Sequence, residues 1–233
     1  MNRHDLLDLL LFFVFLGGLI VSVQSLNQSS LAIQTAKENN QISYNYYAPS
    51  LETKEILGYD ANIKNLSGKI VIYNSGGRVI NFIPNLYTIA KIDYSNYEKR
   101  SYILIYGYYE PSGEETYSSE GLLWEYRISD GYDKFDKVRR DFYSAASEAF
   151  NDASLSLKIV LYASYKDFAR KNYFEYYDVA NSEIIAEQDA KKMITEAREN
   201  YDLASKYDLS LYLNDIDGEK LFKWWQANLK KSN

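Results

Sequence analysis

The strongest pattern of apolar positions along the chain is an uninterrupted run near its beginning. The run begins at Leu6 and ends at Val23, and Asp8 is the one charged residue within it. As an α-helix this run would extend about 27 Å, close to the thickness of the hydrocarbon core of a bilayer. The pattern predicts a transmembrane helix, with residues 1–25 forming an N-terminal membrane anchor or an uncleaved signal.

A cleaved signal peptide is the alternative interpretation of the same run. Cleavage after Ser25 would give a mature chain that starts at Leu26. The run is longer than the apolar core of roughly 7–15 residues that signal peptides carry, which favours the anchor. Apolar side chains continue at helical spacing beyond Leu26, through Ile33 and Ala36. This spacing predicts that the helix runs on as a stalk over residues 26–40.

The charges that flank the run set the expected orientation. Arg3 precedes it, and no basic residue follows it until Lys37. By the positive-inside rule we expect a single-pass protein of the cell membrane, with its N-terminus in the cytoplasm and the bulk of the chain extracytoplasmic. Asn27 and Asn65 each begin an N-x-S sequon on the outer side, and the sequence leaves their glycosylation open.

Residues 41–131 consist of short apolar runs separated by turn residues, which predicts a β-rich domain. Two of these runs, 69–74 and 78–83, flank a Ser-Gly-Gly turn and predict a β-hairpin, whose second strand Pro84 is expected to end. Further strands are predicted at 42–47, 86–92, 101–109 and 122–128. About six strands would suffice for a small antiparallel sheet or sandwich.

The chain changes character after residue 131, because residues 132–217 contain neither Gly nor Pro. A β-rich segment of this length would contain turn formers, so we predict a helical domain over residues 132–233. Ser182 is a candidate N-cap for a helix with an apolar stripe that ends at Ala204. The predicted helices cover residues 133–153, 155–180, 182–204 and 219–229. The predicted fold class is α+β: an N-terminal transmembrane helix, a small antiparallel β-sheet or sandwich domain, and then an α-helical bundle.

Composition narrows the chemistry that the chain can perform. Its 233 residues include 24 Tyr, and tyrosine suits half-buried strands and contact surfaces. There is no cysteine, and the only histidine, His4, lies on the cytoplasmic side of the predicted span. The extracytoplasmic part therefore lacks Ser-His-Asp and Cys-His catalysis and any metal site built on His or Cys. The net charge of −6 argues against nucleic acid as a partner, since phosphate binding needs a concentrated basic surface.

Carboxylates are the remaining candidates for catalysis or metal binding. Five of them surround a loop of Gly, Pro and Ser, namely Glu110, Glu114, Glu115, Glu120 and Glu125. A glycosidase needs two carboxylates at a set distance, but a solvated loop is the simpler interpretation. Asp215, Asp217 and Gly218 match the centre of a calcium loop, whereas Leu213 and Trp224 occupy its end positions, where Asp and Glu are needed. A turn and a helix N-cap explain that segment better, so we predict no catalytic residue, no cofactor and no metal site.

Aromatic clusters form the candidate interaction surface, for a protein partner or for a second copy of the chain. Its members are Tyr44, Tyr46, Tyr47, Tyr106, Tyr108, Tyr109, Trp224 and Trp225. At alternating strand positions the tyrosines also fit the two faces of a sheet. The tryptophans fit either an interfacial anchor or a terminal helix that docks on the domain, and docking is the interpretation we favour.

These patterns predict a structural or protein-interaction subunit of a surface or envelope assembly, bound to the lipid bilayer through its N-terminal helix and not an enzyme. Two alternatives are a carboxylate-dependent glycan hydrolase, with two acidic residues across a cleft, and a ligand-binding module, with an enclosed aromatic pocket. The apolar helix, the β domain and the hairpin at 73–77 resemble archaeal pilin-like and filament-associated proteins. The Lys/Arg-Gly processing site expected before the apolar run is missing and the long helical half departs from that pattern, so the chain is not assigned to that family.

Overall fold

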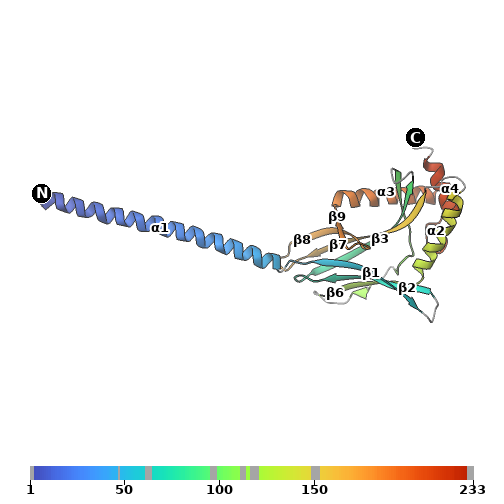
Figure 1. Cartoon of the computed structure of the whole chain (residues 1–233), viewed down its shortest axis with the longest axis horizontal. Coiled ribbons are helices and arrows are strands. Elements are labelled where there is room, and N and C mark those ends of the chain that lie inside the picture. The colour runs from blue at the N-terminus through green and yellow to red at the C-terminus, as the bar shows by residue number, and fades with distance from the viewer. Residues whose placement is uncertain are drawn as a thin grey trace. The chain divides into compact units, whose positions relative to one another are not determined.

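The computed structural model describes seven stretches of the chain, namely residues 3–46, 48–60, 65–94, 99–110, 114–115, 121–147 and 153–229. The chain divides into two compact units, Met1–Ala48 and Pro49–Asn233. Figure 1 shows the first as one long helix and the second as a body of strands and helices.

The first unit is helix α1 (Arg3–Tyr46), which has 44 residues. At the usual rise of 1.5 Å per residue it is about 66 Å long. Residues 26–40, which the sequence predicts as a helical stalk, are helical, because they belong to α1. The strand predicted at 42–47 is wrong, because residues 42–46 belong to α1 and residue 47 lies outside the described residues. Extending an existing helix adds one hydrogen bond per residue, whereas a strand here would need a partner.

The apolar run near the N-terminus lies within α1. Within the part of the chain that the structure describes, no helix is both long enough and apolar enough to cross a membrane. The side chains of residues 6–14, 17 and 20 lie outside the described residues. The span predicted between Leu6 and Val23 therefore stays a prediction. Among the side chains that are described on α1, large apolar ones such as Phe15 and Leu31 are exposed.

The second unit contains two antiparallel sheets together with helices, so the α+β class is confirmed. Sheet A consists, in spatial order, of β1 (Leu51–Asp60), β2 (Asn65–Asn74), β6 (Gly121–Ile128) and β5 (Glu114–Glu115). Sheet B consists, in spatial order, of β4 (Lys99–Leu104), β3 (Ile80–Tyr94), β7 (Ser154–Lys166), β8 (Asn172–Asp178) and β9 (Glu183–Ile185).

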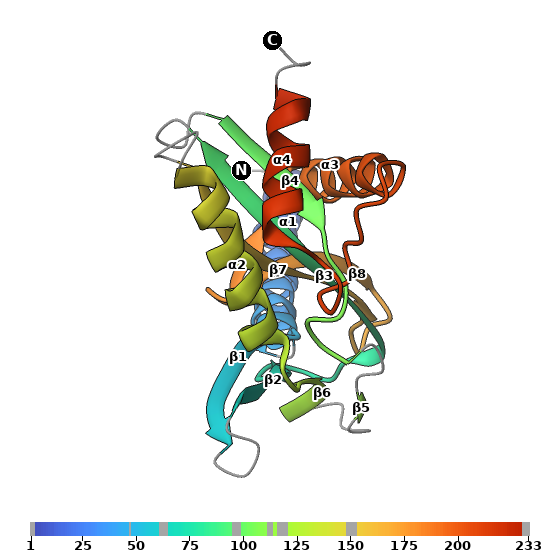
Figure 2. The same ribbon diagram turned by 90° about the vertical axis from the view of Figure 1, so that its right-hand side faces the viewer.

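The main core lies between the two sheets, which Figure 2 shows as two layers. Ile70 and Ile72 of β2 and Ala90 and Ile92 of β3 are buried in one apolar cluster. Successive side chains of a strand point to opposite faces, so Ile89 lies on the outer face of sheet B. Each large side chain buried in this way stabilises the fold by about 1.5–3 kcal/mol.

Helices pack against the sheets at two places. Helix α2 (Gly131–Ser147) and helix α4 (Gly218–Leu229) pack on each other, with the rings of Phe142 and Phe222 5.4 Å apart between centroids. Helix α3 (Glu187–Ser205) covers part of the outer face of sheet B through Met193 and Ala197. Three of the four predicted helices are therefore confirmed. The turn and N-cap before the last one are confirmed as well, since Asp217 Oδ1 accepts a hydrogen bond from Lys220 N at 3.0 Å.

The helix predicted at 155–180 is wrong, and the expected helical bundle fails here, because this segment forms β7 and β8. Strand β7 pairs with β3, so sheet B takes strands from both halves of the chain. The misleading feature is the lack of Gly and Pro, because β7 does alternate between polar and apolar residues along most of its length. Leu161 lies in the core between the sheets, while Ser156 and Lys158 lie on the other face. Val160 interrupts that polar face, because it lies in the cluster under α3. The resulting apolar run at 159–163 gives the segment the appearance of a buried helix.

The turns of this segment explain why it lacks Gly and Pro. Asp167 Oδ1 accepts a hydrogen bond from Lys171 N at 2.8 Å, and Arg170 takes a left-handed conformation with φ 62°. In the next turn, Asp178 Oδ1 accepts a hydrogen bond from Ala180 N at 3.2 Å, and Ser182 has φ 55°. Aspartate side chains thus shape turns that glycine would otherwise form. The predicted capping role of Ser182 is wrong, because the N-cap of α3 lies further along and makes no side-chain hydrogen bond.

The hairpin predicted at 69–83 is also wrong, because β2 pairs within sheet A and β3 within sheet B. Asn74 explains the change of direction. Its Oδ1 atom accepts hydrogen bonds from Ser50 N and Gly76 N, both at 3.1 Å, and its Nδ2 atom donates to Gly77 O at 2.7 Å. These bonds fix a turn that carries the chain from one sheet to the other.

The contact between α2 and α4 can be tested with Gly218→Ala. A Cβ atom at this position would lie 2.2 Å from Val138 O and 2.7 Å from Phe142 N, so the helices would have to separate. We expect the free energy of unfolding to fall by about 1–3 kcal/mol, measured by denaturant titration. The control is Gly58→Ala in β1, where nothing lies within 4 Å of the added atom. Equal stability of the two variants would contradict this account of the packing.

Candidate binding site

An open stretch of strand edge positions the candidate site. β3 pairs with β7 on one side, but β4 pairs only with residues 89–94, which leaves residues 80–88 without β4 on the other side. Pro84 lies in this stretch, and its carbonyl oxygen accepts a hydrogen bond from Tyr126 Oη at 3.3 Å. Its nitrogen faces the same side, where the missing N–H interrupts no ladder. For this reason proline does not end the strand, contrary to the prediction.

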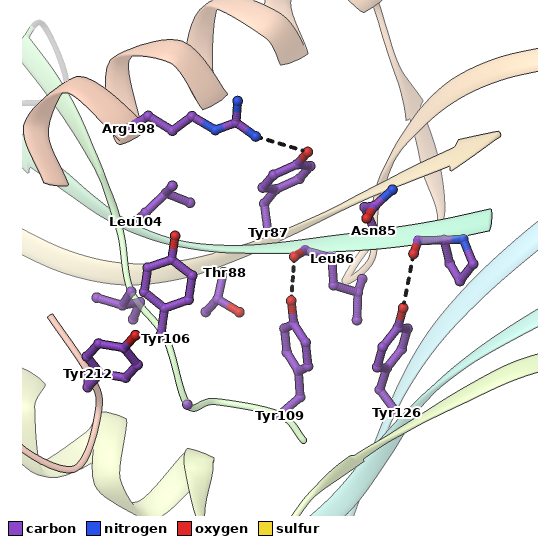
Figure 3. Close-up of a pocket in the computed structure, with 13 residues that line it drawn as sticks. Asn85, Leu86, Tyr87, Thr88, Leu104, Tyr106, Tyr109, Tyr126, Arg198 and Tyr212 are labelled. Carbon is purple, nitrogen blue, oxygen red and sulfur yellow. Dashed lines mark hydrogen bonds between the residues drawn. The ribbon is translucent and has the colours of Figure 1, made fainter. Parts of the chain in front are cut away.

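Beyond the end of β4, the chain turns away from β3. Ile105 N still donates to Thr88 O at 3.0 Å, but Tyr106 N donates to Leu211 O at 3.0 Å, in a different segment. Gly107 follows with φ 86°, a left-handed conformation that favours glycine. A cavity of about 540 Å³ lies along the edge that is left open. Figure 3 shows side chains from β3, β6, α3 and the segment before α4 around it.

Tyr109 and Tyr126 hold one wall of the cavity. Tyr109 Oη donates a hydrogen bond to Leu86 O, and Tyr126 Oη donates to Pro84 O. The two rings meet edge to face, with centroids 5.3 Å apart. Backbone carbonyls of a strand need donors, and here the two hydroxyls replace the N–H groups of a neighbouring strand. Both rings are therefore fixed in place, as Figure 3 shows.

Tyr106 and Tyr212 form a second wall that solvent can reach. Their ring planes are inclined by 30° and their centroids lie 5.4 Å apart. Tyr201 of α3 supports Tyr106 edge-on, with centroids 5.3 Å apart. Tyr106 is 43 % exposed and Tyr212 is 55 % exposed. These two rings offer a supported aromatic surface at the mouth of the cavity.

Arg198 of α3 supplies the positive charge of the site. Its guanidinium lies over the ring of Tyr87, 5.4 Å from the centroid, and donates a hydrogen bond to Tyr87 Oη at 3.3 Å. None of the ion pairs among the described residues involves Arg198. These two contacts with Tyr87 orient the guanidinium and leave further N–H donors available.

Thr88 places a buried hydroxyl beside the cavity. Its side chain is 3 % exposed, and Oγ1 has no hydrogen-bond partner at bonding geometry among the described residues. The same hydroxyl is close enough to Tyr109 to favour the ionised phenol, which slightly opposes the effect of burial on the pKa of Tyr109. A buried hydroxyl without a good partner is costly, and a ligand atom in the cavity would relieve that cost.

Burial favours the protonated phenol of three tyrosines of the site. It raises the pKa of Tyr126 to about 12 and raises the pKa of Tyr109 still further. The pKa of Tyr106 is raised mainly by burial, while Arg198 acts in the opposite direction. These three phenols are therefore neutral hydrogen-bonding groups at physiological pH, not nucleophiles or bases.

The structure brings together only part of the predicted tyrosine surface. Tyr106 and Tyr109 both line the cavity. Tyr108 is buried and donates a hydrogen bond to Glu55 Oε1 at 2.6 Å. Tyr44 and Tyr46 belong to α1, but their side chains, like all of residue 47, lie outside the described residues. Tyr47 is thus the one predicted site residue whose backbone is not described either.

The two predicted tryptophans have different environments. Trp225 is buried, and its Nε1 atom donates to Ser101 Oγ at 3.3 Å, so it docks α4 on the core. Trp224 lines a second hollow of about 330 Å³ beside Tyr207 and Leu209. Its Nε1 atom is buried with no hydrogen-bond partner among the described residues. Neither tryptophan lines the cavity beside β3.

The acidic residues do not gather at the cavity. No carboxylate belongs to its described lining. Glu125 pairs with Lys69 at 2.7 Å, and Glu110 accepts a hydrogen bond from Ser129. Glu120 and the side chains of Glu114 and Glu115 lie outside the described residues. Within the part of the chain that the structure describes, no group of His, Cys, Asp and Glu is arranged to hold a metal ion.

Sequence reasoning missed most of the cavity. Tyr87, Tyr126, Arg198 and Tyr212 come from four separate segments, and no spacing in the sequence connects them. Pro84 was the available signal, because a proline inside a strand marks an edge without a ladder on that side. Comparison with family models, with curated proteins and with solved structures gives no match to this chain.

The buried phenol of Tyr126 makes a prediction about alkaline stability. Its pKa is about 12 in the folded chain and about 10 when unfolded, so its contribution is fully present below pH 10 and is lost as pH rises through 12. We expect Tyr126→Phe to reduce the fall in unfolding free energy over this range, by roughly 1.4 kcal/mol per pH unit. Denaturant titrations at several pH values in this range measure the unfolding free energy of both proteins. Tyr143→Phe, at an exposed position of α2, is the control. Identical slopes for wild type and Tyr126→Phe would contradict the prediction.

Proposed function

We propose that the chain is a membrane-anchored, extracytoplasmic subunit that makes protein contacts within a surface or envelope assembly. The observation that carries the proposal is a patch on the outer face of sheet B in which two large apolar side chains are exposed. We call this patch the open face, and its members are Ile83, Asn85, Tyr162, Ser164 and Phe174.

The strand register brings these residues side by side. Ile83 of β3 and Phe174 of β8 both lie opposite Ser164 of β7, so the three form one row across the sheet. The next row contains Asn85 and Tyr162. Helix α3 covers this same face only farther along the strands, where Ile89 is buried. On the part of the face that α3 does not cover, Ile83 is 56 % exposed and Phe174 is 57 % exposed.

Exposed apolar side chains that are rimmed by polar residues are typical of protein interaction sites, and aromatic residues are enriched in the centres of protein interfaces. Covering two large side chains would release apolar surface from water at about 25 cal/mol per Å². A protein partner or a second copy of the chain supplies that cover.

The anchor in this proposal is the apolar run from Leu6 to Val23. Its length matches the bilayer, and a helix that is apolar all round is stable only when it is covered. The exposed side chains of Phe15 and Val21 on α1 fit lipid as that cover. Arg3 before the run supports a cytoplasmic N-terminus. The hydrolase alternative has no comparable support, because the described lining of the cavity contains no carboxylate.

The open face can be tested by site-specific photo-cross-linking in cells that make the protein. We expect a photoreactive residue in place of Phe174 or Ile83 to give one discrete cross-linked product. Phe174→Ser in a chain that carries the photoreactive group at position 83 should weaken that product severalfold, because the apolar contact is lost. The matched control position is Leu203, an exposed apolar residue on α3. Equal cross-linking from positions 203 and 174 would rule out the open face as an interface.

The anchor needs a separate measurement. We expect the protein to stay in the membrane fraction after carbonate extraction and to show its full-length intact mass, because the apolar run is retained. Leu16→Arg should release a fraction of it, since an arginine in the middle of a span costs about 2.5–3.5 kcal/mol. Leu31→Arg, beyond the run, is the control. A soluble chain that begins near Leu26 would contradict the anchored subunit.

A further inference from the structure

The cavity beside β3 has a chemical character that the open face lacks. Its mouth carries an aromatic pair, one rim carries a cation, and a buried hydroxyl lies beside it. We propose that it binds an acidic saccharide, with a pyranose ring on Tyr106 and Tyr212 and the sugar carboxylate on Arg198. This site shares Asn85 with the open face, but it does not depend on the protein contact proposed there.

The aromatic pair suits a sugar ring. One face of a pyranose presents C–H groups, which pack on an aromatic ring, while its hydroxyls point outward to polar groups. Tyr106 and Tyr212 combine apolar ring faces with hydroxyls that donate and accept. Both rings reach solvent, and Tyr201 already holds Tyr106 edge-on. Little side-chain freedom is therefore lost when a ring settles on them.

The guanidinium of Arg198 favours an acidic ligand. Arg198 belongs to none of the ion pairs among the described residues, and the described lining contains no carboxylate to repel an anion. A guanidinium that lies over an aromatic ring and donates a hydrogen bond to its hydroxyl keeps its planar fork oriented. That fork matches the two oxygens of a carboxylate. A neutral sugar would leave this match unused.

The buried hydroxyl favours a ligand rich in hydroxyls over a simple organic acid. Thr88 Oγ1 lacks a partner at bonding geometry among the described residues, and an aromatic or aliphatic acid has no second polar group to offer it. A sugar hydroxyl in the cavity would offer Thr88 Oγ1 such a group. The volume of about 540 Å³ falls within the range of about 300–1,000 Å³ for small-molecule sites and leaves room for more than one sugar unit.

A peptide strand is a poorer occupant of the same space. Adding a strand to the open edge of β3 would require its carbonyls as acceptors. Tyr109 and Tyr126 already donate to the carbonyls of Leu86 and Pro84, so a peptide would have to break both hydrogen bonds. A sugar that rests on ring faces leaves these bonds intact.

The test is isothermal titration calorimetry on the full chain, held in a polyoxyethylene detergent that carries no sugar headgroup. The ligands are a short galacturonic acid oligosaccharide, its methyl ester and benzoate. The ester keeps the sugar rings and removes the charge, whereas benzoate keeps the charge and removes the sugar. The variants are Arg198→Gln, Tyr212→Ala and Thr88→Val, and the matched control is Arg78→Gln, an exposed arginine outside the lining.

We expect the acidic oligosaccharide to bind, and Arg198→Gln to weaken it about tenfold or more, as loss of a charged hydrogen bond predicts. The ester should bind wild type as weakly as the acid binds Arg198→Gln, and Tyr212→Ala should weaken both sugars. Thr88→Val, which keeps the side-chain shape, should weaken them less, and Arg78→Gln should match wild type. No heat with the acid up to millimolar concentrations, equal affinity for acid and ester, or equal affinity for benzoate would overturn the proposal.

Discussion

The pairing of β3 with β7 is the contact on which the rest of the second unit depends. It joins residues 80–93 to residues 154–166, so neither half of the chain can form sheet B alone. The pairing sets which side chains of β3 enter the core between the sheets and which lie under α3, because a shift by one residue would exchange the two faces. Ile92 and Ile89, buried on opposite faces, fix that register from both sides.

The same strand is longer than its second neighbour, and the cavity follows from that mismatch. β4 accompanies β3 only over residues 89–94, so the carbonyls before Ile89 need other donors. Tyr109 and Tyr126 provide them with side-chain hydroxyls, which keeps the edge open and protected from strand addition. The abundance of tyrosine thus has a local explanation here: a ring fills the space that a strand would fill, and its hydroxyl forms the bond that an N–H would form.

The sequence reveals the elements whose pattern is local and misses those defined by distant contacts. The apolar stripe that ends at Ala204 and the strand at 122–128 were predictable because each has one buried face. The segment 155–180 was not, since the apolar run at 159–163 hides the alternation of β7 and aspartates replace glycine in its turns. The hairpin at 69–83 failed because Asn74 redirects the chain through three hydrogen bonds, which no propensity encodes.

The site shows the same division between local and distant information. Tyr106 and Tyr109 could be selected from a run of tyrosines, but Arg198 and Tyr212 join them only because α3 and the segment before α4 fold back beside β3. What distinguishes these side chains from structural filler is the unequal use of their atoms. The hydroxyls of Tyr109 and Tyr126 serve the backbone, whereas Arg198 and Thr88 retain bonding capacity that the described residues do not use. A groove that only protected the edge of β3 would not need the unused bonding capacity of Arg198 or of Thr88.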